Sequence, residues 1–70
     1  MSVLIKLAKV GMKHTVMKDM LFTDIVKKGT VLTIDHIGRF DVALRPEFPN
    51  VRYVMSIGSY EDALRKGILK

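Results

Sequence analysis

Alternating apolar and polar positions are clearest in the second half of the chain, where they predict antiparallel strands. In residues 51–57, apolar side chains occupy every second position: Val51, Tyr53, Met55 and Ile57. This period of two, carried by β-branched and aromatic residues, is typical of a half-buried strand. The same pattern predicts strands over residues 30–37 and 40–45, with a tight turn at residues 36–39 between them. Two prolines make residues 45–50 a loop.

The C-terminal residues change to a helical pattern. Ser59 is a predicted N-cap, and the two acidic residues after Tyr60 lie in the first turn, where the helix dipole favours negative charge. Gly67 is well placed to end this short helix, because glycine readily adopts the left-handed conformation found at helix ends. Ile68 and Leu69 are then expected to return to the core.

The N-terminal residues alternate over positions 2–10, which favours a strand that breaks at Gly11. If this strand lies at a sheet edge, it invites pairing with a copy of itself, and Lys6 blunts that tendency only in part. Its apolar run is too short for a membrane span or a signal peptide core. We therefore expect no contact with a membrane.

Residues 12–28 fit either a helix or β structure. The helical interpretation gives an α+β fold and places apolar residues on one side of the helix: Met12, Val16 and Met20. In the β interpretation, residues 14–20 are a strand, 21–24 are an irregular loop and 27–29 turn into the next strand. We favour the β interpretation because β-branched residues weaken a helix here: Thr15, Val16, Ile25 and Val26.

Two segments resemble the opening of small SH3-like β-barrels, which are common in short phage and prophage proteins. Residues 16–20 look like the first strand and its loop, and a Lys-Lys-Gly turn within residues 25–34 starts the second strand. Residues 61–69 are similar to the short helix and Gly-apolar ending of such chains. Residues 2–10 and the loop at 46–49 depart from the pattern. The resemblance implies a barrel scaffold and a phage or mobile-element source, and it implies no activity.

Length and composition favour one domain over residues 1–70, since a chain this short cannot build two cores. We predict a mainly β fold, a small SH3-like antiparallel barrel with a short C-terminal helix. The chain has no Cys, which excludes disulfides and thiolate metal sites and suits a reducing cytoplasm (the host cytoplasm, if the protein is phage-encoded). An apolar fraction of 49% leaves apolar surface exposed or covered by another chain, so self-association is expected.

No catalytic or metal-binding constellation is evident. The sequence has no Gly-rich phosphate loop, no His-x-x-x-His pair and no nucleophile elbow. His14 and His36 are far apart in sequence and would need a third ligand such as Asp24 or Asp35. We therefore predict a non-enzymatic protein with no cofactor, no metal and no small-molecule substrate.

A protein partner is the first binding hypothesis. Phe48 lies between two prolines, and beside Arg45 and Arg52 it resembles the anchors of protein interfaces, although it could fold back over the barrel instead. A second candidate surface is rich in flexible thioethers, which suit adaptable contacts: Met12, Met17 and Met20, with Phe22. These residues could instead fill the core.

Nucleic acid is the alternative partner. The net charge is +5, and residues 1–28 carry six Lys against two Asp. These lysines could form a phosphate-contacting surface: Lys6, Lys9, Lys13, Lys18, Lys27 and Lys28. Few aromatic residues are placed for base stacking, so such binding would tolerate any sequence. The same lysines could simply keep a small domain soluble. We expect an accessory protein that binds a protein partner or itself, with nucleic-acid binding as the alternative.

Overall fold

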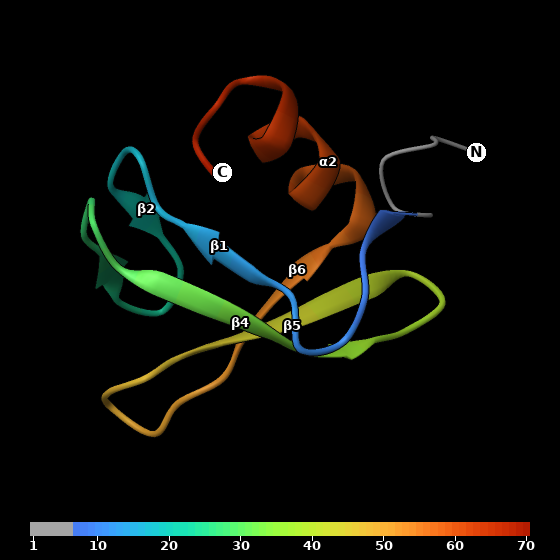
Figure 1. The fold of residues 1–70 in the computed structure, drawn as a ribbon, viewed down its shortest axis with the longest axis horizontal. Helices are drawn as coiled ribbons and strands as arrows, with labels where there is room; N and C mark the ends of the chain where they lie inside the picture. The colour runs from blue at the N-terminus through green and yellow to red at the C-terminus, as the bar shows by residue number, and fades with distance from the viewer. Residues whose placement is uncertain (1–6) are drawn as a thin grey trace.

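The computed structural model describes residues 7–70, where antiparallel strands form two sheets and a C-terminal helix covers one face of the larger sheet (Figure 1). The larger sheet has the strand order β1-β4-β5-β6: β1 (Lys13–Thr15), β4 (Val31–Ile37), β5 (Asp41–Pro46) and β6 (Tyr53–Ser56). The smaller sheet is a hairpin of β2 (Met20–Leu21) and β3 (Ile25–Val26), and the helix is α2 (Ile57–Arg65). The predicted antiparallel β fold with a short C-terminal helix is confirmed.

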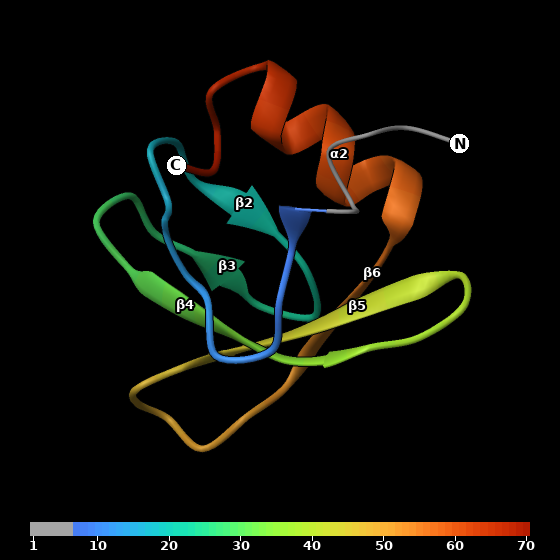
Figure 2. The same ribbon diagram turned by 45° about the vertical axis from the view of Figure 1, so that its right-hand side comes forward.

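A closed SH3-like barrel is not formed within residues 7–70. β6 is the last strand of the larger sheet, and the β2–β3 hairpin is a separate sheet, drawn in teal and green in Figure 2. A backbone bridge between Val16 and Leu69 connects the segment after β1 to the C-terminal residues. The structure therefore has the expected antiparallel strands, but they do not close into a barrel.

The helix considered for residues 12–28 is wrong, because this segment is divided among β1, β2, β3 and their turns. Its backbone groups bond across strands: the Val16 N–H donates to Thr30 O and the Gly29 N–H donates to Val16 O. Gly29 has a φ of 96°, a left-handed conformation that suits glycine at the predicted turn. The single strand expected over 14–20 is interrupted after Val16.

The predicted N-terminal strand at 2–10 is only partly within the described residues, since residues 1–6 lie outside them. Residues 8–12 are not a strand, because Val10 and Gly11 form a turn in which the Met12 N–H donates to Lys9 O. Gly11 has a φ of 94°, in agreement with a break at this position.

The β4–β5 hairpin turns later than predicted. His36 and Ile37 remain in β4 opposite Ala43 and Val42, and the Gly38 N–H donates to Asp41 O at 2.8 Å. A register shift between Ile34 and His36 marks a β-bulge in β4. The strand nevertheless ends at Ile37, as the pattern over residues 30–37 predicted. Phe40, which the alternation assigned to the apolar strand face, is exposed in the turn.

The core lies between the larger sheet and α2. Its largest fully buried side chains come from β4, β5, α2 and the two bridged residues Val16 and Leu69: Tyr60, Leu32, Ile34, Leu44, Leu69, Val16 and Val42. Tyr53 is also buried, as the apolar alternation of residues 51–57 predicted. Burial of this cluster is the main stabilising contribution in a domain that has no disulfide.

Residues 68–70 pair with the segment that includes the end of β1. Val16 and Leu69 form an antiparallel bridge, and Leu69 is fully buried. Backbone hydrogen bonds of 2.7–3.0 Å flank the bridge, joining Thr15 with Lys70 and Met17 with Ile68. We call residues 15–17 and 68–70 together the C-terminal clasp. The predicted return of Leu69 to the core is confirmed.

α2 begins earlier than predicted. Its N-cap is Ser56 rather than Ser59, and the Ser59 N–H donates to Ser56 Oγ at 3.1 Å. Glu61 and Asp62 therefore lie beyond the first turn. The helix ends at Arg65, and Gly67 follows it with a φ of 72°, in agreement with the predicted glycine stop.

Ser56→Ala is expected to lower the free energy of unfolding by about 1 kcal/mol, because it removes the oxygen that accepts the Ser59 N–H. Ser59→Ala is the matched control, since it deletes a hydroxyl at the same helix end and leaves the cap oxygen in place. Urea unfolding of both variants checks the assignment. A loss for Ser59→Ala as large as that for Ser56→Ala would contradict it.

Candidate protein-binding surface

The β2–β3 hairpin exposes one of its two cross-strand pairs. Met20 pairs with Val26 and Leu21 pairs with Ile25. Val26 is buried in the core and Met20 packs against it, whereas Leu21 and Ile25 are 79% and 62% exposed. The hairpin register thus presents two large aliphatic side chains to solvent.

Two hollows flank this hairpin. The first is a groove of about 550 Å³ between the β2 end of the hairpin and β6, lined by Leu21, Phe22, Val54 and Met55 among others. The second, of about 260 Å³, lies between β3 and the β5–β6 loop, and Ile25 and Phe48 line it. Tyr53 lines both hollows, and its ring stacks on that of Phe22 with a centroid distance of 4.8 Å.

Phe48 lies in the β5–β6 loop and is 84% exposed, so it does not fold back over the core. Its side chain lines the second hollow together with Ile25. We call Leu21, Ile25 and Phe48 the hairpin surface. Sequence reasoning selected Phe48 correctly as an exposed aromatic residue and missed its two aliphatic neighbours.

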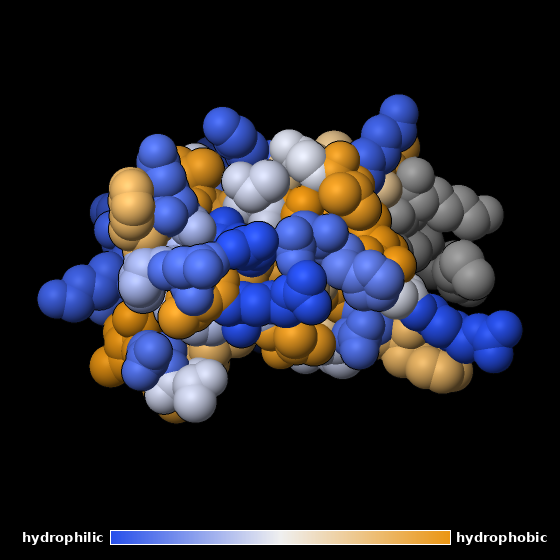
Figure 3. Space-filling view, turned by 90° about the horizontal axis from the view of Figure 1, so that it is seen from below, coloured by the Kyte–Doolittle hydropathy of each residue, from blue (hydrophilic) through white to orange (hydrophobic). Residues whose placement is uncertain are grey.

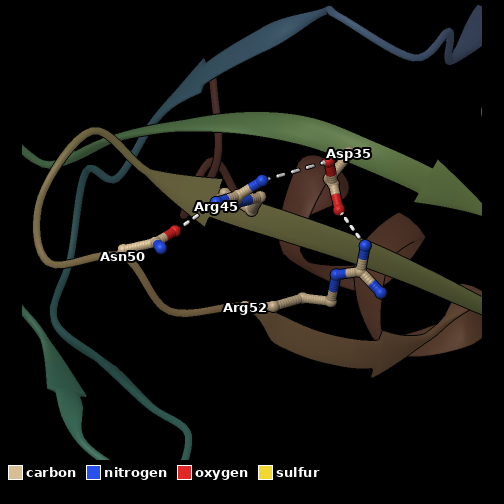
Figure 4. Close-up of polar contacts among 4 residues, drawn as sticks. All are labelled: Asp35, Arg45, Asn50 and Arg52. Atoms are coloured by element: carbon tan, nitrogen blue, oxygen red, sulfur yellow. Dashed lines mark hydrogen bonds and ion pairs between the residues drawn. The ribbon is translucent and has the colours of Figure 1, made fainter.

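A carboxylate of β4, that of Asp35, pairs with both Arg45 and Arg52 (Figure 4). Arg52 Nη2 donates to Asp35 Oδ2, and Arg45 Nη1 lies 3.7 Å from Asp35 Oδ1. Arg45 also donates to Asn50 Oδ1. Figure 3 shows the side of the larger sheet turned away from α2, with hydrophilic residues across its middle and apolar residues on either side. Of the two arginines, Arg52 also lines the first groove.

The methionine-rich segment is divided between the core and the surface. Met12, Met20 and Phe22 are partly buried and pack against the core, while Met17, a residue of the C-terminal clasp, is exposed. Of these residues, Met20 and Phe22 also line the first groove. The segment therefore fills the core and contributes one wall of the groove.

The lysines of the described residues belong to several elements of the fold. Lys18, Lys27 and Lys28 occupy the two turns that bound the hairpin, where Asp19 Oδ1 accepts the Lys28 N–H at 2.8 Å. Lys13 lies in β1, opposite Thr33 of β4. Lys9 is exposed before β1, and Lys6 lies outside the described residues. The positive charge is thus divided among several elements. The carboxylate of Asp19 lies among the three lysines of the hairpin turns.

A buried His–Tyr pair lies on the core side of the larger sheet. The atoms His14 Nε2 and Tyr60 OH are 2.6 Å apart, and both residues are buried. Burial lowers the pKa of His14, an effect that the Lys70 backbone opposes, and burial raises the pKa of Tyr60. His36, in contrast, is exposed. Within residues 7–70, no three His, Asp or Glu side chains gather as a set of metal ligands.

The lowered pKa of His14 predicts a loss of stability in acid. Because the native pKa lies below the ordinary value of 6.5, the unfolded chain takes up this proton first, and stability falls as the pH drops below about 6.5. Urea unfolding midpoints from pH 7.5 to 5 measure the effect. His14→Gln, which does not titrate, should show a shallower dependence; an equally steep one would contradict the assignment.

Comparisons with known proteins give no match: no family model fits the chain, and no curated protein or solved structure matches it significantly. Among residues 7–70, there is no helix with the length and apolar character needed to cross a membrane.

Proposed function

We propose that the protein is a non-enzymatic interaction module that binds a protein partner through the hairpin surface. The observation that carries this proposal is the grouping of Leu21, Ile25 and Phe48 around two hollows that share Tyr53. Large apolar side chains that remain exposed and lie together are typical of protein-binding sites, and an exposed aromatic residue is a suitable anchor. As part of the same proposal, the scaffold is an open relative of the SH3-like barrel. The antiparallel strand order supports this part of the proposal.

A protein partner fits this surface better than a nucleic acid does. Tyr53 is buried and its ring stacks on Phe22, so this pair does not offer free faces to bases. The described lysines belong to different elements, and the carboxylate of Asp19 accepts the Lys28 N–H among them, which weakens the attraction for a phosphate backbone. A titration with labelled single-stranded DNA at physiological salt tests this alternative, and tight binding there would favour it.

Selection from a random-peptide library tests the proposal, with sedimentation velocity to detect binding of the protein to itself. We expect the wild type to enrich a peptide consensus and the double variant Leu21→Ser/Phe48→Ser to enrich none. Phe40→Ser is the matched control, because Phe40 is 76% exposed in the β4–β5 turn and lines neither hollow. No consensus and no self-association of the wild type, or an unchanged consensus in the double variant, would refute the proposal.

A further inference from the structure

His14 connects β1 to two other parts of the fold. Its ring nitrogen Nε2 lies 2.6 Å from the hydroxyl of Tyr60 on α2, and the two rings meet edge to face with a centroid distance of 5.4 Å. The next residue, Thr15, exchanges two backbone hydrogen bonds of 2.8 and 3.0 Å with Lys70, where residues 68–70 return beside β1 (Figure 1). A change at the His14 ring therefore acts on α2 and on the C-terminal clasp together.

The surroundings of His14 suit a neutral ring. Its second nitrogen, Nδ1, is buried and makes no hydrogen bond within residues 7–70. A neutral imidazole carries one N–H and can satisfy Nε2 with the Tyr60 hydroxyl in either direction. A protonated imidazole carries an N–H on both nitrogens, so Nδ1 would become a buried charged donor without an acceptor. The Lys70 backbone favours the proton, but its carbonyl already accepts the Thr15 N–H, so it offsets this cost only in part.

No ion pair within residues 7–70 stabilises a charge on His14. β4 places Leu32 opposite this residue, and α2 contributes Tyr60, whose hydroxyl stays protonated because burial raises its pKa. Glu61, the next residue of α2, is also buried, and no carboxylate of the described residues forms an ion pair with His14. Lys13, before it in β1, is exposed. Burial therefore lowers the pKa of His14, and the ring takes up a proton more readily once it reaches water.

The C-terminal clasp is the smallest of the units that hold His14 in place. Residues 68–70 contribute one fully buried side chain, that of Leu69. β4, in contrast, is paired on both sides within the larger sheet, and α2 is a helix of nine residues. Small units with few buried contacts open at a lower free energy than the whole domain. Opening of the clasp is therefore the expected route by which the His14 ring reaches water while the sheet remains paired.

We propose that His14 is a proton-sensitive latch on the C-terminal clasp: in mild acid, its protonation releases residues 68–70 from residues 15–17, while the larger sheet stays folded. Release frees the backbone groups of Thr15 and Met17 that bond to Lys70 and Ile68, and leaves an unpaired strand edge. Exposure of this edge thus depends on pH. The proposal is independent of the proposed function, because none of these residues belongs to the hairpin surface.

Native-state hydrogen exchange of the full protein at about pH 7 and about pH 5.5 tests the latch. The opening constants of the Thr15 and Met17 amides report the clasp, because these amides donate to Lys70 and Ile68. After correction for intrinsic exchange, we expect these constants to rise about fivefold at the lower pH, since the open state binds the proton more tightly. Low concentrations of urea should change them little, because local opening exposes little surface. The opening constant of Ile34 in β4 should rise steeply with urea.

His14→Gln is the matched variant, because glutamine can still bond to the Tyr60 hydroxyl and does not titrate. Its clasp amides should have the same opening constants at both pH values, and a rise equal to that of the wild type would overturn the latch. Wild-type opening constants that do not rise in acid would also overturn it. So would a urea dependence at Thr15 and Met17 as steep as that at Ile34, since the clasp would then open only with the whole domain. If His14→Gln does not fold, the wild-type pH and urea series decides the question.

Discussion

Tyr60→Ala is expected to leave the protein unfolded at room temperature. Tyr60 on α2 is only 1% exposed, and truncation of a buried aromatic residue costs about 3–5 kcal/mol. A domain of this size without a disulfide has a total stability of about 3–5 kcal/mol. Loss of this one ring therefore removes most of the free energy that holds α2 to the sheet. Circular dichroism should show no cooperative thermal transition.

Tyr60→Phe is the matched control for this variant. It keeps the ring and removes the hydroxyl that lies 2.6 Å from His14 Nε2, so a buried imidazole nitrogen loses its partner. The expected loss is about 1–3 kcal/mol, which leaves a folded but less stable protein. A cooperative transition in Tyr60→Ala near the wild-type midpoint would contradict the placement of this residue at the centre of the core.

Leu69→Ala is expected to have an effect of similar size, because Leu69 is the buried side chain of the C-terminal clasp. Truncation of a buried leucine costs about 2–5 kcal/mol. Lys70→Ala is the control, since its side chain is exposed and its backbone bonds to Thr15 are kept. Urea unfolding should separate the two variants clearly. If the two variants were equally stable, the clasp would contribute little to the free energy of unfolding.

Hydrogen exchange provides a local measurement of the same clasp. The amides of Thr15 and Met17 donate to the carbonyls of Lys70 and Ile68. A mildly destabilising replacement, Leu69→Val, should accelerate exchange at these two amides more than at Ile34, which lies in the central strand β4. Equal acceleration at all three would mean that the clasp opens only when the whole domain unfolds.

The strands that could be predicted are those in which the period of two is long enough to be unambiguous. Residues 30–37 and 51–57 alternate over several positions, and β4 and β6 lie within them. Residues 12–28 form strands of two or three residues, too short to show a period, so their β-branched content was the only usable signal. The bulge in β4 depends on pairing with β5 and had no local signal, although the end of the strand at Ile37 was predicted. The start of α2 was placed too late, because Ser56 rather than Ser59 caps the helix.

The candidate surface was predictable only in part. Phe48 was a candidate because two prolines hold it in a loop, but the sequence alone also allowed it to fold back over the core. Leu21 and Ile25 were not, because the hairpin register alone decides which of its two cross-strand pairs faces outward. The contacts of Asp35 with Arg45 and Arg52 join three elements that are separate in sequence, and no local pattern signals them.

The C-terminal clasp has a consequence for synthesis on the ribosome. Val16 emerges early and Leu69 late, and translation at about 5–20 residues per second separates them by about 3–10 s. During this interval β1 and β4 can pair, but the nascent chain exposes the apolar surface that Leu69 later covers. The domain therefore completes its fold only after residue 69 has left the exit tunnel, and a translational pause before that point would prolong its exposure to chaperones and proteases.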